Sequence, residues 1–303
     1  IRGAEHLAAS TEFLELEELP RRLVLVGGGY IAAEFSHIAA RAGAQVTILQ
    51  RDERLLTGFD PDLVQWLTDK SRALGIDIRL NAEVKAIEKV AKGFRVHFDS
   101  EGATSSIEAD LAVHAGGRVP DLEPLELDEG GIEHAEHHLK LNEYLQSTSN
   151  PAVYAAGDAA AVGPPLTPVA GRDGRVAARN MLEGNRDKPN YLGVPSVVFT
   201  IPPLARVGLL EEEARRRNLR FHVRKDNTAA WYTASRVAED CAGFKTLVED
   251  GSGRILGAHL IGPHADEVIN IFGLAIRRGL SAAELSDLVF GYPTAASDIG
   301  YML

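Results

Sequence analysis

The stretch Leu23-Val24-Leu25-Val26-Gly27-Gly28-Gly29-Tyr30-Ile31-Ala32 passes from an apolar run through a glycine turn into a helical pattern. The apolar run predicts a strand, and residues 30–41 and 45–49 predict the helix and second strand of a βαβ unit. In the turn, Gly27 permits a tight bend and Gly29 lets a pyrophosphate approach the N–H groups of the helix N-terminus. Ala32 lets the helix lie close to the strand. The stretch therefore predicts a Rossmann-like, α/β nucleotide-binding domain.

The end of the second predicted strand discriminates between nicotinamide cofactors. An acidic side chain at this place binds the ribose 2′-hydroxyl of NAD and repels the 2′-phosphate of NADP. The sequence instead has Gln50, followed by Arg51 and Arg54. Because guanidinium groups bind phosphate with paired hydrogen bonds, NADP is predicted in preference to NAD. The alternative is that the two arginines pair with Asp52 and Glu53 on the surface, which leaves NAD open.

Composition bounds the class of protein. The 303 residues suffice for two or three domains, and a hydrophobic fraction of 45% with a charged fraction of 25% is typical of soluble globular proteins. The N-terminus has no signal pattern and no apolar run approaches a membrane span, so we expect a cytoplasmic protein without membrane contact. The net charge of -11 argues against non-specific nucleic-acid binding. Since the chain begins at Ile1 rather than Met, we expect it to be a portion of something longer.

Cysteine and histidine usage excludes two further kinds of site. Cys241 is the single cysteine, which excludes an internal disulfide and a two-cysteine redox centre within these residues. His134, His137 and His138 lie close together in a Glu-rich stretch with no predicted strand or helix to aim them. They are predicted to form a solvated surface, and no metal site is predicted.

The remaining chain divides into a strand-rich first half and a second α+β region. Asp60 followed by Pro61 predicts the start of a helix, because an aspartate cap and a proline in the first turn favour helix initiation. Gly157-Asp158 follows a strand predicted over 153–155, at the sheet edge where ligands bind in open α/β folds. Ser281 and Glu284 have the spacing of a capping box. The other predicted strands are 76–80, 84–88, 94–99, 110–114, 196–200, 220–224, 244–249 and 254–262, and the other predicted helices are 168–182, 211–218, 265–278 and 281–288.

These motifs together resemble one enzyme family. Gly27-Gly28-Gly29-Tyr30-Ile31-Ala32-Ala33-Glu34 resembles the nucleotide loop of the class I pyridine nucleotide-disulfide oxidoreductases, which include glutathione reductase, dihydrolipoamide dehydrogenase and mercuric reductase. Gly117-Arg118-Val119-Pro120 resembles the family's G-R-x-P segment. Tyr154-Ala155-Ala156-Gly157-Asp158 with Leu166-Thr167-Pro168-Val169-Ala170 resembles its second flavin-binding motif. The resemblance covers essentially the whole chain. It implies an NAD(P)-binding domain over 1–118, the C-terminal part of an FAD-binding domain over 119–190, and an α+β dimerisation domain over 191–303.

The resemblance also implies residue roles. Tyr30 would lie over the flavin ring and move aside for nicotinamide, and Glu34 would pair with a lysine of the flavin domain. Asp158 would accept hydrogen bonds from the ribityl-phosphate region of FAD, and Thr167 would meet the pyrimidine edge of the flavin. The alternatives are a packing role for Tyr30, a helix-dipole role for Glu34 and a capping role for Asp158. The residues expected to bind cofactor are Gly27, Gly29, Tyr30, Ile31, Glu34, Arg51, Gly117, Gly157, Asp158, Leu166, Thr167 and Ala170.

Two departures from the family pattern limit the prediction. The family's N-terminal dinucleotide loop and C-x-x-x-x-C pair are not among these residues, and Tyr292-Pro293-Thr294 stands where the family commonly has His-Pro-Thr. A tyrosine, with a reference pKa of about 10, is a poorer proton shuttle near neutral pH than a histidine at about 6.5. No catalytic residue is therefore predicted.

The resemblance implies a homodimeric oxidoreductase in which NADPH reduces FAD and electrons pass to a disulfide or small-molecule acceptor. The apolar helix Val268 to Ala275 is expected to contribute to the dimer interface. Two alternatives stay open. The chain could be a nucleotide-binding and dimerisation module without turnover, or it could belong to an NAD(P)H oxidase-like electron-transfer flavoprotein.

Overall fold

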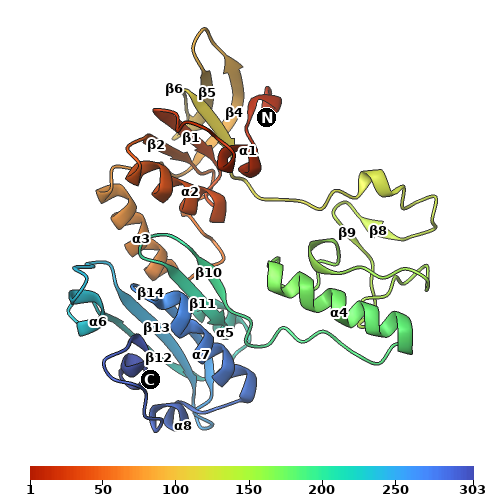
Figure 1. Cartoon of the computed structure of the whole chain (residues 1–303), viewed down its shortest axis with the longest axis vertical. Helices are drawn as coiled ribbons and strands as arrows, with labels where there is room; N and C mark the ends of the chain where they lie inside the picture. Colours follow the sequence, from red (N-terminus) through yellow and green to blue (C-terminus); the bar gives the residue numbers. More distant parts are fainter. The chain divides into compact units, whose positions relative to one another are not determined.

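The computed structural model describes residues 1–303. In it the chain forms two compact units. Unit 1 combines Ile1–Gly117 with Pro195–Leu303, and unit 2 is Arg118–Val194. Figure 1 colours the chain along its sequence, so that unit 1 contains the red, orange and blue segments. The N-terminal and C-terminal regions of the sequence thus form one body.

The first part of unit 1 is a parallel sheet with strand order β3-β2-β1-β7. The four residues Leu23, Val24, Leu25 and Val26 of β1 are all buried, as expected for a parallel strand covered on both faces. The nucleotide-loop helix α2 follows β1 directly, and α3 begins at the predicted Asp60 cap, which accepts from the N–H groups of Asp62 and Leu63. The elements are β1 (Arg22–Val26), α2 (Tyr30–Arg41), β2 (Gln45–Leu49), α3 (Pro61–Ala73), β3 (Asp77–Arg79) and β7 (Leu111–His114). The predicted βαβ unit is therefore present.

A three-stranded antiparallel sheet is inserted before β7. It consists of β4 (Ala82–Lys89), β5 (Phe94–Ser100) and β6 (Ala103–Ala109) in that order. The sequence predicted the first two strands and missed β6, because Ala-Thr-Ser-Ser-Ile-Glu-Ala is polar and mostly exposed. The backbone partners supplied by β5 define this strand, and hydrophobic alternation does not reveal it. Ahead of β1 lie the short elements η1 (Ala4–His6) and α1 (Ser10–Leu14).

The second part of unit 1 is an antiparallel sheet with strand order β10-β11-β14-β13-β12. Its strands are β10 (Ser196–Val198), β11 (Leu204–Gly208), β12 (Phe221–Asn227), β13 (Gly243–Glu249) and β14 (Ile255–Ile261). Its helices are α5 (Glu211–Arg216), α6 (Tyr232–Ser235), α7 (Ala265–Arg278), α8 (Ala282–Ser286) and α9 (Ile299–Met302), with η4 (Ala295–Asp298) between the last two. The sequence missed β11, α6 and α9. It correctly predicted the Ser281–Glu284 capping box at the start of α8.

The expectation that Val268 to Ala275 supplies a dimer interface is wrong for its apolar face. Val268, Ile269, Phe272 and Ala275 are buried inside the chain's own core, with exposures of at most 5%. They belong to the cluster that packs α7 against the sheet. Leu274, on the other side of the helix, is 57% exposed. The apolar periodicity marked the face that the five-stranded sheet covers, since the sheet must bury one of its faces against a helix.

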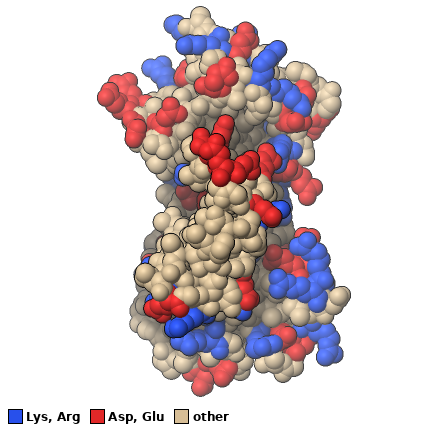
Figure 2. Space-filling model, turned by 90° about the vertical axis from the view of Figure 1, so that its right-hand side faces the viewer, with Lys and Arg blue, Asp and Glu red and all other residues tan.

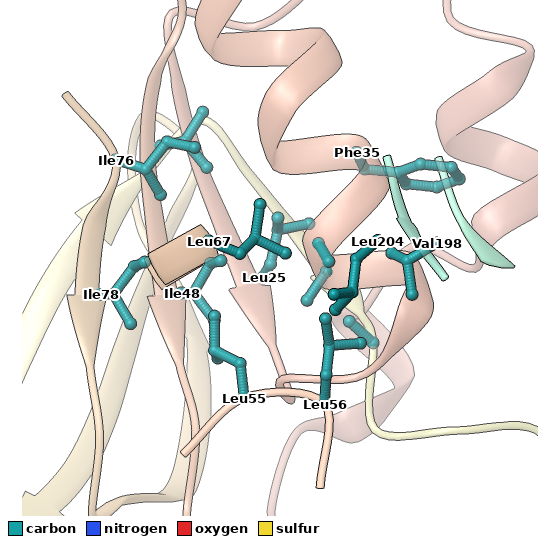
Figure 3. Close-up of a cluster of buried hydrophobic side chains, with 14 of the residues drawn as sticks. Leu25, Phe35, Ile48, Leu55, Leu56, Leu67, Ile76, Ile78, Val198 and Leu204 are labelled. Atoms are coloured by element: carbon teal, nitrogen blue, oxygen red, sulfur yellow. The ribbon is translucent and has the colours of Figure 1, made fainter. Parts of the chain in front are cut away.

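One hydrophobic core joins the two sheets of unit 1. Figure 3 shows Leu25 and Ile48 from the parallel sheet and Leu67 from α3 in a cluster that also contains Val198 and Leu204. The last two side chains come from β10 and β11 of the antiparallel sheet. Since this buried cluster is continuous, the nucleotide-loop region and the C-terminal region are held together by the same apolar packing.

Unit 2 contains little regular structure apart from the helix α4 (Thr167–Glu183). The strand predicted over 153–155 is absent, and Tyr154 makes only an isolated bridge with Gln146. The predicted helix 168–182 is confirmed. The remaining elements are η2 (Glu123–Leu125), β8 (His134–Ala135), β9 (His138–Leu139) and η3 (Gly157–Ala159). The histidine stretch is expected to lack a strand, but it forms a two-stranded hairpin of β8 and β9. In it, His134 lies 3.4 Å from Asp128 and His137 lies 3.7 Å from Glu136.

The surface carries side chains of both charges. On the face drawn in Figure 2, acidic and basic side chains are interspersed around an area that contains few of either. None of the helices combines the length and the apolar character needed to cross a bilayer.

Candidate nucleotide and flavin site

The glycine turn between β1 and α2 has no room for side chains on its inner side. Gly27 has φ 117°, and a Cβ built on it would lie 2.4 Å from the carbonyl oxygen of Ala115. A Cβ on Gly28 would lie 2.7 Å from the Leu55 side chain. Gly29 differs, because its nearest neighbour would be the Ala115 oxygen at 3.7 Å. Gly27 and Gly28 thus close the turn against the sheet, whereas the space at Gly29 is open.

The N-terminus of α2 begins at this open position. Gly29 is the N-cap residue, and no side chain caps the helix. The first backbone hydrogen bond across this end runs from Ala33 N–H to the Gly29 oxygen at 3.0 Å. The N–H groups of Tyr30, Ile31 and Ala32 therefore lie at a helix end without intrahelical acceptors. They and the positive end of the helix dipole can bind a phosphate.

Tyr30 lies at the entrance to this helix end. It is 38% exposed, and its ring meets Phe59 edge-on with a centroid distance of 5.5 Å. Partial burial raises the pKa of the Tyr30 phenol, while a hydrogen bond with the Ser196 side chain and the charge of Arg206 act against this rise. The phenol is therefore neutral at physiological pH. The exposed part of the ring is available to a planar ligand.

The end of β2 shows how its polar residues are used. Gln50 is 7% exposed and donates from its amide to Asp52 at 2.8 Å and to the Arg54 carbonyl oxygen at 3.3 Å. The Arg54 guanidinium donates to the carbonyl oxygens of Thr57 at 2.9 Å and Phe59 at 3.1 Å, which holds the following loop. Arg51 is different, because its side chain is 79% exposed and lies 3.7 Å from Asp52. Of the two arginines, only Arg51 presents a largely unengaged guanidinium.

Glu34 lies one turn further along α2. Its Oε1 accepts the backbone N–H of Phe199 at 3.0 Å. The side chain is half-buried. One carboxylate oxygen therefore binds the segment that follows β10, and Oε2 accepts no hydrogen bond from within this chain.

Unit 2 brings Gly157 and Ala170 together. A Cβ on Gly157, which has φ 64°, would lie 2.8 Å from the Ala170 Cβ. The small side chains let η3 lie against the first turns of α4. The carbonyl oxygen of Leu166 accepts from the N–H groups of Val169 at 2.9 Å and Ala170 at 3.0 Å, and no side chain caps α4. This is a second helix N-terminus left open.

Asp158 and Thr167 are the exposed polar residues at this second helix end. Asp158 forms no hydrogen bond or ion pair within the chain, and the residue that caps η3 is Ala156, which makes no side-chain hydrogen bond. The capping role considered for Asp158 is therefore not observed. The carboxylate is free to accept hydrogen bonds from hydroxyl groups of a ligand. Gly117, with φ 116°, ends unit 1 and joins it to Arg118.

Two other candidate residues are placed outside these positions. Cys241 is buried, its Sγ lies 3.7 Å from the Trp66 carbonyl oxygen, and burial raises the pKa of its thiol to about 12. A buried thiol with a raised pKa is unreactive. The Tyr292 side chain is 83% exposed. No group of three or more His, Cys, Asp or Glu side chains is placed to hold a metal ion.

Sequence reasoning missed two polar groups that position these elements. His37 on α2 is 1% exposed and hydrogen-bonded on both ring nitrogens. The buried Lys245 lies 3.1 Å from Asp60 and 2.7 Å from Glu211. A histidine inside an apolar helix pattern and a lysine within a predicted strand carry no local signal of this kind. Their partners come from distant parts of the sequence.

Comparison with known proteins agrees with this arrangement. Residues 2–174 match the family model described as pyridine nucleotide-disulphide oxidoreductase, and residues 194–302 match the dimerisation domain of the same family. A mercuric reductase of Staphylococcus aureus is 33% identical over 291 residues, which is 96% of this chain and 53% of the relative. A dihydrolipoyl dehydrogenase of Bacillus subtilis is 32% identical over 96% of this chain and 62% of the relative. The chain thus spans between half and two thirds of these relatives.

A solved structure provides the corresponding comparison in three dimensions. The HOCl-induced flavoprotein disulfide reductase RclA from Escherichia coli matches with a TM-score of 0.88 and 31% identity, over 100% of this chain and 69% of that chain. An uncharacterized 19.7 kDa protein in a mercuric resistance operon of Staphylococcus aureus is 52% identical over 180 residues, 59% of this chain and 100% of the relative. The matches to the family models agree with the glycine turn and with the architecture. The chain therefore belongs to the pyridine nucleotide-disulphide oxidoreductase family.

Proposed function

We propose that this chain supplies the nicotinamide-binding region, the dimerisation region and part of the flavin-binding region of an oxidoreductase. In that enzyme NADPH reduces FAD, and electrons pass to a disulfide or small-molecule acceptor. One observation carries the proposal: the uncapped N-terminus of α2 opens at Gly29, directly before the partly exposed Tyr30. A pyrophosphate and a planar ring would there find adjacent binding groups.

The nicotinamide nucleotide would be held by the backbone at Gly27, Gly29 and Ile31, with Arg51 close to the adenosine ribose. Gln50 supports NADP over NAD, because no carboxylate stands at its position to bind the 2′-hydroxyl. Arg51 supports it through its exposed guanidinium. Arg54 does not, because its donors are engaged by backbone carbonyl groups. The phosphate preference therefore rests on a single arginine.

The residues of unit 2 fit a flavin nucleotide. FAD supplies reversible acceptance of a hydride when it is bound. Asp158 would accept hydrogen bonds from its polyhydroxyl chain, and the open end of α4 at Leu166, Thr167 and Ala170 would donate to the edge of its ring. The free carboxylate of Asp158 and the uncapped helix support this assignment. For Tyr30, Glu34 and Gly117, which belong to unit 1, the support for a part in cofactor binding is the family resemblance.

A homodimer is part of the proposal. The match to a dimerisation domain over residues 194–302 supports it. Val289 is 99% exposed and Leu288 is 54% exposed, in the segment that precedes Tyr292. These apolar side chains, rather than the buried face of α7, are suited to contact a second copy. Sedimentation analysis of Val289→Asp beside the parent chain tests this assignment.

A visible absorption spectrum tests the flavin part of the proposal. The purified chain is incubated with FAD, desalted, and titrated without oxygen with NADPH and separately with NADH. A retained band near ~450 nm that bleaches preferentially with NADPH supports the oxidoreductase function. A chain that binds NADP⁺ by calorimetry and retains no flavin supports the alternative of a binding and dimerisation module.

Arg51 provides the sharpest test of cofactor choice. Arg51→Ala is expected to weaken NADP⁺ binding by roughly ten- to a hundredfold, the range for losing hydrogen bonds to a charged group, and to leave NAD⁺ binding unchanged. Arg95→Ala, which removes an equal charge from the exposed face of β5, is the matched control. Tighter binding of NAD⁺ than of NADP⁺ by the parent chain would contradict the assignment.

A further inference from the structure

One stripe of side chains on α2 faces the segment that begins with β10. Tyr30, Glu34, His37 and Arg41 are spaced by four, three and four residues, which places them on one side of the helix. All four meet residues between Ser196 and Ile201. The nucleotide-loop helix and this segment of the antiparallel sheet therefore lie side by side over three turns.

The contacts occur in the same order along α2 and along the segment Ser196–Ile201. At the helix N-terminus the Ser196 side chain lies near the Tyr30 phenol and acts to lower its pKa. Glu34 Oε1 then accepts from the Phe199 N–H at 3.0 Å, and His37 Nδ1 accepts from the Ile201 N–H at 3.2 Å. Arg41 closes the stripe by donating to the Ile201 carbonyl oxygen at 3.1 Å.

His37 is the buried member of the stripe, and only one form of its ring satisfies its partners. Because Nδ1 accepts from Ile201, the proton of the neutral ring is on Nε2, which lies 2.9 Å from Ser71 Oγ. Ser71 in turn donates to the Leu67 carbonyl oxygen at 2.7 Å and is free to accept from His37. A doubly protonated ring would carry a proton on Nδ1, which would then point at the N–H of Ile201. The contact with Ile201 therefore requires neutral imidazole.

The surroundings keep the ring neutral. Burial is the largest effect, and together with the charges of Arg41 on α2 and Lys70 on α3 it outweighs the opposing effect of the Ile201 backbone and lowers the pKa of His37 to about 4. Lys70 is itself paired with Glu239 and Asp240 from the C-terminal region, which reduces its effect on the ring. Glu34 lies one turn away on the same helix and is bound to Phe199.

We propose that His37 is a positioning residue for the nicotinamide nucleotide. It fixes the segment Ser196–Ile201 against α2, and this segment lies beside Tyr30 at the open N-terminus of that helix. This inference rests on the proposed function and adds a residue that touches neither nucleotide nor flavin. Its effect on the nucleotide passes through the backbone of Ile201.

Two substitutions of His37 distinguish the role of Nδ1 from the role of Nε2. In His37→Asn the side-chain oxygen can replace Nδ1 and accept from Ile201, whereas the bond to Ser71 is lost. In His37→Gln the terminal nitrogen can replace Nε2 and donate to Ser71, whereas no acceptor lies near Ile201. We expect His37→Gln to weaken NADP⁺ binding about tenfold, as a buried N–H left unpaired would cause. His37→Asn is expected to stay within about twofold of the parent chain, since its acceptor is kept.

Hydrogen exchange of the free chain gives a second readout that does not depend on nucleotide. The Ile201 amide should exchange about tenfold faster in His37→Gln and at nearly the parent rate in His37→Asn. The pH profile gives a third. NADP⁺ affinity of the parent chain should fall as pH drops from 6 towards 4 more steeply than that of His37→Asn, while titration of the 2′-phosphate affects both alike.

The outcomes separate this inference from the proposed function. Equal NADP⁺ affinities of the Asn and Gln variants would overturn the positioning role, even if exchange at Ile201 differed. Equal exchange rates at Ile201 would overturn the contact on which the role depends. If the parent chain bound no nicotinamide nucleotide at all, the proposed function would fail, and the exchange comparison would still decide whether His37 holds the segment. Ser71→Ala removes the partner of Nε2 and keeps the ring. It should reduce NADP⁺ affinity and the protection of the Ile201 amide less than His37→Gln does. It replaces His37→Gln in both measurements if that variant does not fold.

Discussion

Units 1 and 2 both present an open helix N-terminus, but they support it in different ways. In unit 1, α2 stands on a continuous core shared by two sheets. In unit 2, the two hydrophobic clusters contain only three buried side chains each. Since apolar burial is the main stabilising contribution to folding, unit 1 is the rigid support and unit 2 the part expected to open first. The open end of α2 is thus supported by a large core, whereas the open end of α4 has little apolar packing behind it.

Ion pairs show the same contrast and give the largest expected effect. Lys245 is 6% exposed and lies within 3.1 Å of Asp60, Asp62 and Glu211. Burial acts to lower the pKa of this lysine, and the three carboxylates outweigh it and keep the pKa raised. Lys245→Met would leave three carboxylates around an apolar side chain. Breaking a buried pair in this way costs about 3–5 kcal/mol of unfolding free energy.

The measurement is urea unfolding followed by tryptophan fluorescence, because Trp66 and Trp231 both lie in unit 1. Lys188→Met is the control in unit 2, where the lysine pairs with Glu143 at 2.7 Å and is 52% exposed. An exposed ion pair contributes little to stability because water screens it, and its removal should be detected only by hydrogen exchange in unit 2. A similar loss in the two variants would remove the contrast between the units.

Histidine burial gives the next effect, a pH dependence confined to unit 1. Burial lowers the pKa values of His37 and His259 to about 4, whereas His134, His137 and His138 of unit 2 are exposed. The pKa in the folded state lies below the value of about 6.5 expected in the unfolded chain. The unfolded chain therefore binds more protons between these values, and stability is lost as pH falls from 6.5 towards 4.

For one such histidine the limit is about 3 kcal/mol. Urea unfolding of the parent chain at pH 7 and pH 4.5, compared with His37→Asn, measures the part that His37 contributes. Between the two pH values, the free energy of unfolding reported by tryptophan fluorescence should fall less in the Asn variant than in the parent chain. If both proteins lost the same amount, His37 would be charged or exposed in solution.

A glycine in unit 2 gives the smallest effect. Gly157 has φ 64°, and its added Cβ would lie 2.8 Å from the Ala170 Cβ. Gly157→Ala is expected to cost about 1–2 kcal/mol from the left-handed backbone, with a further loss from the contact. Adding Ala170→Gly should relieve the contact and leave the backbone cost. Hydrogen exchange of α4 measures both variants, and full recovery in the double variant would show that the backbone contributes nothing.

Local sequence predicted the elements whose signals lie within a few residues. The glycine turn, the boundaries of α2 and α7, the Asp60 cap and the Ser281–Glu284 capping box are all as predicted. Each depends on backbone conformations or short-range hydrogen bonds that particular side chains favour. The strand predicted over 153–155 failed because an apolar run in unit 2 has no neighbouring strand to pair with, and β6 was missed because its partner β5 defines it.

The sequence by itself determined the family, the glycine loop and the residues that stand at each open helix end, because these depend on residue type and short spacing. Only the tertiary structure decided which candidates are free to bind. It engaged Arg54 with two carbonyl oxygens and left Arg51 exposed. It also turned the apolar face of α7 inward and joined His37 to Ile201 across 164 residues of sequence. The physical reason is that burial and hydrogen bonding are satisfied by groups from distant segments, and these partners are fixed only when the chain is folded.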